Sequence, residues 1–175
     1  MLPTIKIGLI GPESTGKSTL AESLAARFGG MCVPEYARKY VGTLGRPYTY
    51  DDVCLIAERN RYEAHTAQGL TFFDTELIIT KVWFDEVYHQ RPQWLTAPVP
   101  KDCRMDFYLL TAPDLPAVPD PLRENLSQPA RERLFRLYLA ETESTGVPFA
   151  IVKGVGHERQ ARAERILQDW FSGQR

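Results

Sequence analysis

The sequence predicts a three-layer α/β/α domain with about five mostly parallel strands and a short lid. Segments typical of strands alternate with segments typical of helices along the chain. An apolar segment typical of a buried strand begins at residue 5, almost at the first residue. The length of 175 residues and a hydrophobic content of 43% suffice for one domain with a substantial core. We therefore expect a single domain over residues 1–175.

Short apolar runs bounded by turn residues mark the expected strands. These runs cover residues 5–10, 31–33, 70–73, 107–110 and 149–152. The third run ends directly on Asp74.

Helices are expected where apolar residues recur every three to four positions. The first covers Lys17–Phe28, and Gly29 suits its carboxyl end. The second helix starts at Asp51-Asp52 and ends before Gly69, and the third covers 76–90 and ends at Arg91-Pro92. The fourth runs from Pro129 to about Ser144, and the last covers 158–171.

Five prolines lie in the segment 113–129 that precedes the helix starting at Pro129. A segment this rich in proline does not form the interior of a helix. We expect an ordered loop, at approximately 113–129, that acts as a lid.

Charge and composition exclude several classes of protein. The formal net charge of −1 argues against general nucleic-acid binding, which favours a basic surface. No signal peptide and no membrane span is visible, and three scattered cysteines fit a reducing compartment. His65, His89 and His157 show no metal-ligand spacing. We expect a cytoplasmic protein with no nucleic-acid or membrane partner.

Residues 11–18, Gly-Pro-Glu-Ser-Thr-Gly-Lys-Ser, match the phosphate-binding pattern G-x-x-x-x-G-K-[ST] between an expected strand and an expected helix. In a P-loop NTPase-type fold, backbone N–H groups and the helix N-terminus surround the phosphates. Lys17 can reach the β- and γ-phosphates and Ser18 can ligate Mg²⁺. The motif therefore predicts ATP and Mg²⁺ as cofactors, held by Gly11, Glu13, Ser14, Thr15, Gly16, Lys17, Ser18 and Thr19.

Such a site needs a second acidic anchor for Mg²⁺, and Asp74 at the end of a strand fits. The alternative is that Asp74 caps the next helix. The small size and the proline-rich lid are typical of a small-molecule kinase, and the guanine-recognition pattern N-K-x-D is absent.

Glu35 follows the expected second strand, so it belongs to the carboxyl edge where ligands bind in such folds. It can accept a hydroxyl proton or hold a ribose. Arg123 in the lid can lie across the transferred phosphoryl group. Arg131 and Arg133 are interpreted as a solvated helix face. Aromatic residues gather near the expected acceptor site, and we interpret most of them as core: Tyr36, Tyr40, Tyr48, Tyr50, Trp83, Phe84, Tyr88 and Trp94.

Four segments together resemble the NadR-like ribosylnicotinamide kinase domain. They are Gly11–Leu20, Pro34–Arg38 (Pro-Glu-Tyr-Ala-Arg), Phe73–Glu76 (Phe-Asp-Thr-Glu) and Asp120–Arg123 (Asp-Pro-Leu-Arg). The resemblance runs from about residue 5 to 155.

The resemblance implies transfer of the ATP γ-phosphate to the 5′-hydroxyl of nicotinamide riboside, giving nicotinamide mononucleotide. It implies that Lys17 and Ser18 serve phosphate and Mg²⁺, that Asp74 is the strand-end acid, and that Arg123 is the lid arginine. It implies that Glu35, Tyr36 and Arg38, with Asp74, border the nucleoside-like small-molecule substrate. Whether Asp74 or Glu35 orients the attacking hydroxyl stays open.

Three departures from the family pattern qualify the resemblance. The chain begins at the kinase strand, so we do not expect adenylation to NAD here. Pro34 stands where the family can have an aromatic residue, and Pro121 where a glycine is common. The alternatives are a kinase for another nucleoside or small metabolite, and an ATP-binding nucleotide-sensing regulator without kinase activity.

Overall fold

The computed structural model describes residues 4–97, 99–120 and 125–174. Within these residues, five strands form one sheet in the order β2-β3-β1-β4-β5, and every neighbouring pair is parallel. The strands are β1 (Ile5–Ile10), β2 (Met31–Val33), β3 (Leu70–Asp74), β4 (Phe107–Thr111) and β5 (Phe149–Val152). The predicted parallel sheet is confirmed.

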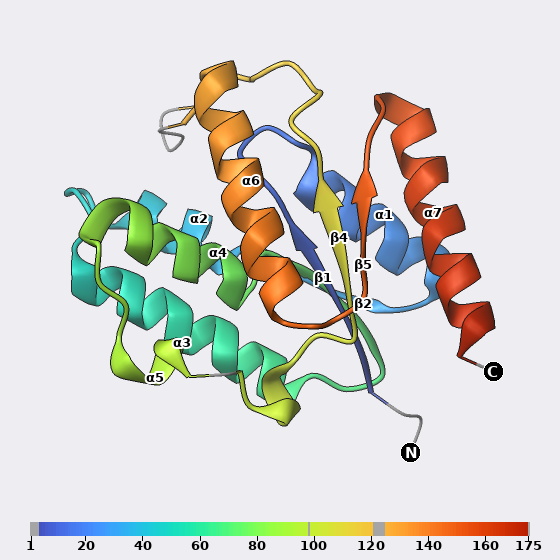
Figure 1. Ribbon diagram of the computed structural model, residues 1–175, viewed down its shortest axis with the longest axis horizontal. Coiled ribbons are helices and arrows are strands. Elements are labelled where there is room, and N and C mark those ends of the chain that lie inside the picture. Colours follow the sequence, from blue (N-terminus) through green and yellow to red (C-terminus); the bar gives the residue numbers. More distant parts are fainter. Residues whose placement is uncertain (1–3, 98, 121–124, 175) are drawn as a thin grey trace.

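Helices cover both faces of the sheet, which confirms the three-layer α/β/α arrangement (Figure 1). α1 and α7 pack on one face, and α3, α4 and α6 pack on the other. The helices are α1 (Lys17–Phe28), α2 (Tyr36–Thr43), α3 (Tyr50–Thr66), α4 (Leu77–Trp83), α5 (Gln93–Thr96), α6 (Gln128–Ser144) and α7 (Gly156–Gly173). A π-helix at Phe84–Tyr88 continues α4, and a 3₁₀ helix covers Lys101–Cys103.

The central strand β1 shows why both faces need a helical layer. Ile7 and Leu9 pack toward α1 and α7, whereas Ile10 packs toward α4 and α6. All three side chains are fully buried. Because successive side chains of a strand point to opposite faces, a strand that is apolar on both sides must lie in the middle of a layered fold.

The structure differs from the predicted helices at three places. α2 was not predicted, because its eight residues are a short run for a helical period and bury only Ala37. α3 begins at Tyr50, since Thr49 and Asp52 form a reciprocal capping box before it. The helix expected over 76–90 is α4 followed by a π-helical turn, which ends where His89 takes a left-handed conformation.

The start of α6 agrees with the sequence. Ser127 is the N-cap residue, its hydroxyl accepts a hydrogen bond from the N–H of Ala130, and Pro129 lies in the first turn. No helix in the described part of the chain is both long and apolar enough to cross a membrane.

Candidate active site

The topology brings the two predicted phosphate-site segments together. β1 lies between β3 and β4, and Leu9 of β1 stands opposite Asp74 of β3. The N–H of Thr75 donates to the carbonyl of Leu9 at 3.2 Å. The loop after β1 and the carboxyl end of β3 therefore share the central part of one sheet edge, where ligands bind in parallel α/β folds.

The loop from Gly11 to Gly16 has the backbone conformation of an anion-binding turn. Gly11, Ser14 and Gly16 have positive φ values of 144°, 55° and 75°. Gly16 is the N-cap residue of α1 and offers no side chain to the first turn. The amides at the start of α1 are thus directed toward a ligand rather than toward a capping side chain.

The side chains of Thr15 and Lys17 form hydrogen bonds with main-chain atoms of the loop. The Thr15 hydroxyl is buried and donates to the Pro12 carbonyl at 2.8 Å, and it lies 2.7 Å from the Thr111 hydroxyl of β4. The Lys17 ammonium donates to the carbonyls of Gly11 and Pro12 at 2.9 and 2.8 Å. Thr15 is therefore suited to bind phosphate through its N–H, while Lys17 lies along the rim of the loop.

Asp74 fits a site for a hard cation. Its side chain is 3% exposed, and its Oδ1 atom is buried without a hydrogen-bond partner, as is the hydroxyl of neighbouring Thr75. Buried polar atoms normally have partners, so such an atom requires an explanation. A carboxylate oxygen and a hydroxyl are the ligands that Mg²⁺ prefers. Asp74 does not cap the next helix, because the Glu76 carboxylate accepts from the N–H of Ile78 and caps α4 instead.

Glu76 is a buried carboxyl that belongs to the segment Phe73–Glu76, but no role was predicted for it. Burial raises its pKa to about 7, against the smaller lowering effects of the Ile78 N–H and Lys81. The Tyr108 hydroxyl of β4 donates to its other oxygen at 3.4 Å. The motif Phe73–Glu76 could have drawn attention to it, but the burial that raises its pKa comes from packing and not from the motif.

Glu35 lies at the same edge of the sheet as the loop, where the strands have their carboxyl ends. It is the N-cap residue of α2, at the carboxyl end of β2 and next to β3. Burial raises the pKa of the Tyr138 hydroxyl on α6, and the carboxylates of Glu13, Glu35 and Glu86 raise it further. These carboxylates therefore act electrostatically on the Tyr138 hydroxyl.

The segment 113–120 makes contacts with both the loop and α2. The N–H of Val118 donates to the Ser14 hydroxyl at 3.1 Å, and the N–H of Asn125 donates to Glu13 Oε2 at 2.7 Å. Arg38 of α2 forms an ion pair with Asp120. The lid expected at approximately 113–129 stays a prediction, and Pro121 and Arg123 lie outside the described residues.

Tyr36 carries a cation on its ring. The Arg59 guanidinium of α3 lies 5.6 Å from the ring centroid, and the Tyr40 ring lies 5.7 Å away. The Tyr40 hydroxyl in turn donates to Asp52 at 2.9 Å. Asp52 also accepts two hydrogen bonds from Arg46, which hold the pKa of this carboxyl well below its usual range. Tyr36, Tyr40, Asp52 and Arg59 form a wall between α2 and α3. Ring contacts, hydrogen bonds and the ion pair between Arg46 and Asp52 hold this wall in place.

The other aromatic residues named from the sequence belong mostly to a core cluster. Tyr50 packs edge-on against Phe84 and Tyr88, and Tyr48 packs against Trp83. Trp94 lies against the same cluster. The interpretation of most of these rings as core is confirmed.

The interpretation of Arg131 as part of a solvated face is wrong. Its side chain is among the largest that are fully buried, and its guanidinium donates to main-chain carbonyls of the phosphate-binding loop. The sequence could not show this, because the contacts join residues more than a hundred positions apart. Arg133 is exposed and pairs with Glu86, as expected for a helix face.

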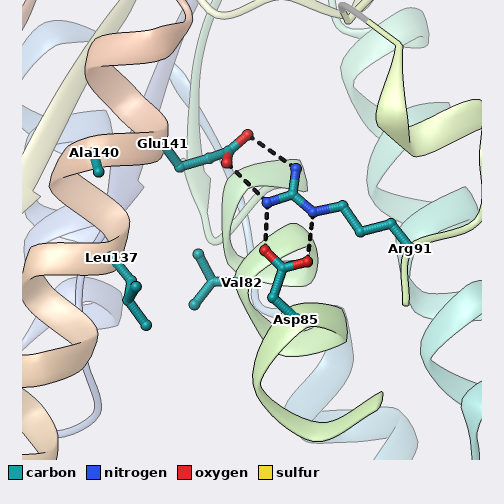
Figure 2. Close-up of a pocket in the computed structure, with 6 residues that line it drawn as sticks. All are labelled: Val82, Asp85, Arg91, Leu137, Ala140 and Glu141. Atoms are coloured by element: carbon teal, nitrogen blue, oxygen red, sulfur yellow. Dashed lines mark hydrogen bonds and ion pairs between the residues drawn. The ribbon is translucent and has the colours of Figure 1, made fainter. Parts of the chain in front are cut away.

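A cavity of about 200 Å³ between α4 and α6 is a separate feature (Figure 2). Arg91 lies there between two carboxylates, donating to Asp85 at 2.8 Å and to Glu141 at 2.9 Å. The Lys81 ammonium also donates to Glu141. This cavity contains no residue of the loop or of β3, so we assign its charges to bridging the two helices.

The fold brings His65 beside two groups that can bind metals. Ligand atoms of His65, Asp102 and Cys103 lie within 4.8 Å of one another. The His65 ring nitrogen lies 2.8 Å from the Asp102 carboxylate, and the Lys6 ammonium donates to the Asp102 carbonyl. The cluster precedes β4, at the edge of the sheet opposite the loop, and a neighbouring ammonium disfavours a second cation there.

Comparison with known proteins agrees with this geometry. A family described as AAA domain matches residues 6–159, most of the chain. The chain belongs to this AAA domain family. The chain is similar to the trifunctional NAD biosynthesis/regulator protein NadR of Salmonella typhimurium, at 27% identity over 96% of the chain, and to NadR of Escherichia coli, at 27% over 97%. The chain spans 43% of the length of each of these relatives.

Solved structures share the fold of this AAA domain. A NadR protein in complex with NR superposes with a TM-score of 0.74 and 21% identity, over 95% of this chain and 49% of the other. A deoxyadenosine kinase from M. mycoides with bound dCMP superposes with a TM-score of 0.64 and 13% identity, over 98% of this chain and all of the other. The predicted resemblance to NadR is confirmed, and P-loop kinases share the architecture.

Proposed function

We propose that this domain is an ATP- and Mg²⁺-dependent kinase that phosphorylates the 5′-hydroxyl of nicotinamide riboside. One observation carries the proposal. The phosphate-binding loop and the buried Asp74 carboxylate lie at one sheet edge, and Glu35 follows β2 at the same edge. The similarity to NadR, over nearly the whole chain, supports this acceptor.

On the phosphate side, the N–H groups of residues 11–19 and the Lys17 ammonium bind the β- and γ-phosphates. Lys17 exchanges its two carbonyl partners in the loop for phosphate oxygens. Asp74 and Ser18 would hold Mg²⁺, which neutralises charge on the phosphates when it is bound.

In the transfer, the acceptor hydroxyl oxygen forms a bond to the γ-phosphorus. The bond between this phosphorus and the β,γ-bridging oxygen breaks, and ADP leaves with that oxygen. The hydroxyl proton goes to a carboxylate, and both Asp74 and Glu35 stay candidates for this base. Arg123 in the lid is the proposed cation across the transferred group.

On the acceptor side, a carboxylate such as Glu35 at the N-cap of α2 favours a ligand with a positively charged ring, such as the pyridinium of nicotinamide riboside. An aromatic face would add a cation–π contribution of about 0.5–2 kcal/mol. Arg59 already lies over the Tyr36 ring, so a pyridinium would have to share this ring with a second cation.

A second candidate, a kinase for another nucleoside, follows from the same contact. Arg59 beside Tyr36 places a cation near the acceptor wall, which disfavours a cationic ring there and favours a neutral base. The fold shared with a deoxyadenosine kinase is compatible with this alternative.

ADP release in the presence of MgATP and a panel of nucleosides tests the proposal. We expect nicotinamide riboside to stimulate ADP release most strongly, with nicotinamide mononucleotide as the product in mass spectrometry. Stimulation by another nucleoside alone would refute the acceptor and support the second candidate. No stimulation by any nucleoside would refute the kinase function.

A further inference from the structure

Arg131 combines full burial with several hydrogen bonds to main-chain atoms. Its side chain is 1% exposed, although it lies on α6 among the charged residues Glu132 and Arg133. A buried guanidinium must satisfy its donors within the protein, because desolvation of an unbonded charge is costly. The partners of this side chain therefore indicate why the position needs arginine.

The guanidinium reaches two carbonyls of the phosphate-binding loop. Nε donates to the Glu13 carbonyl at 3.0 Å, and Nη2 donates to the Ser14 carbonyl at 3.2 Å. Neither peptide is cis. Because C=O and N–H of a trans peptide point in opposite directions, the N–H groups of Ser14 and Thr15 point away from Arg131. This is the direction that a concave loop needs for its amides to meet an anion.

The same guanidinium also holds the beginning of the proline-rich segment. Nη1 donates to the Leu115 carbonyl at 2.8 Å and to Gln128 Oε1 at 3.2 Å. Gln128 in turn donates to the Pro113 carbonyl at 3.0 Å. The first turn of α6 thus ties the segment 113–115 to the loop.

We propose that Arg131 is a positioning residue that aligns the Ser14 and Thr15 amides for phosphate and fixes the segment 113–115 against the loop. Arginine suits this task because its planar fork carries five donors in fixed directions. A lysine at this position keeps the charge, but one ammonium cannot reproduce the planar alignment of three carbonyls. The inference rests on the proposed function only in that the loop binds a nucleotide phosphate.

Titration of the full chain with Mg-AMP-PNP in a calorimeter, without acceptor, tests this role. We expect R131A to raise the Kd for the nucleotide about ten- to a hundredfold. R131K should raise it less but still measurably. Hydrogen exchange at residues 11–18 should become faster in both variants, and the KM for the acceptor should stay unchanged.

R91A is the matched control, because Arg91 also bridges elements through several hydrogen bonds but touches no loop atom. We expect R91A to lower thermal stability and to leave the Kd unchanged. An unchanged Kd in folded R131A, or an equal rise in R91A, would overturn the proposal. If R131A does not fold, R131K decides, and an unchanged Kd in R131K overturns the proposal.

These outcomes are separate from those of the proposed function. A wild-type protein that binds Mg-AMP-PNP but phosphorylates no nucleoside refutes the kinase function. The role of Arg131 is then still decided by comparing the Kd values of R131A, R131K and R91A. A kinase whose R131A and R131K variants bind the nucleotide normally refutes only the role of Arg131. A wild-type protein that binds no nucleotide refutes both.

Discussion

The phosphate-binding loop and the wall formed by α2 and α3 flank the same proposed site but are held by different forces. Hydrogen bonds from the side chains of Arg131 and Lys17 to main-chain carbonyls hold the loop. Side-chain contacts hold the wall, where Arg59 covers Tyr36 and Arg46 pairs with Asp52. The loop offers main-chain N–H groups to its ligand, whereas the wall offers side chains, so the loop suits a constant ligand and the wall a variable one.

This difference predicts that substitutions in the loop and substitutions in the wall have different effects on the choice of acceptor. Changes in the loop and at Asp74 should affect every acceptor equally, because every acceptor receives its phosphoryl group from the same triphosphate donor. Changes in the wall should affect one acceptor more than another, because they alter contacts with the part of the substrate that varies.

Lys17→Ala should have the largest effect. Loss of the ammonium that contacts the phosphates should reduce kcat/KM about 10²- to 10³-fold, by analogy with removal of one donor to a developing charge. Steady-state kinetics measure this loss. Lys101→Ala is the control, since Lys101 is exposed in the 3₁₀ helix before β4, away from the loop. Equal activity of K17A and K101A would contradict the assignment.

Asp74→Asn should follow, with a loss of about 10²-fold in kcat, because the amide keeps the shape but lacks the charge that holds Mg²⁺. Activity measured against Mg²⁺ concentration should show a higher requirement for the metal. Asp169→Asn, at an exposed position of α7, serves as the control. A normal Mg²⁺ requirement with low kcat would instead favour Asp74 as the base.

Glu35→Gln tests whether a residue beside the wall acts on the acceptor and not on ATP. We expect the KM for the nucleoside to rise about tenfold, because one charge-assisted hydrogen bond is lost, while the KM for ATP stays the same. Glu143→Gln on the exposed side of α6 is the control. A rise in the KM for ATP alone would place Glu35 with the phosphate side.

Asp52→Asn should have the smallest effect on turnover and act mainly on stability. The hydrogen bonds from Arg46 lower the pKa of Asp52, so its contribution is present above the unfolded pKa of about 4 and is lost as pH falls through the folded pKa. Urea unfolding should show D52N less stable than wild type at pH 7, with the gap narrowing below pH 4.

Asp51→Asn controls for this experiment, because Asp51 is the exposed neighbour of Asp52 in the first turn of α3. A gap between D52N and wild type that stays constant from pH 7 to pH 3 would contradict the ion-pair account.

The two regions also differ in how far the sequence predicts them. The loop was predicted well because its residues are contiguous and the strand before it and the helix after it have clear periods. The place of Asp74 beside it followed from the end of a strand. Glu35 could be placed at an edge, but the helix that follows it has only eight residues, buries only Ala37 and was not predicted.

The burial of Arg131 shows what sequence patterns cannot reveal. A position on a helix looks solvated from its charged neighbours, and only the packing of α6 against the loop buries it. The same holds for Arg59 over Tyr36, where two separate helices meet. Contacts between distant segments form the wall of α2 and α3. The ligand of this wall is therefore less predictable from sequence than the ligand of the phosphate-binding loop.

Binding of Mg-AMP-PNP to the wild-type chain, measured by calorimetry and compared with K17A, tests the central claim most directly. We expect saturable binding with one nucleotide per chain and a large loss of affinity in K17A. A wild-type protein that takes up no magnesium nucleotide, or a K17A variant that binds as tightly as wild type, would contradict the claim that the loop after β1 binds phosphate.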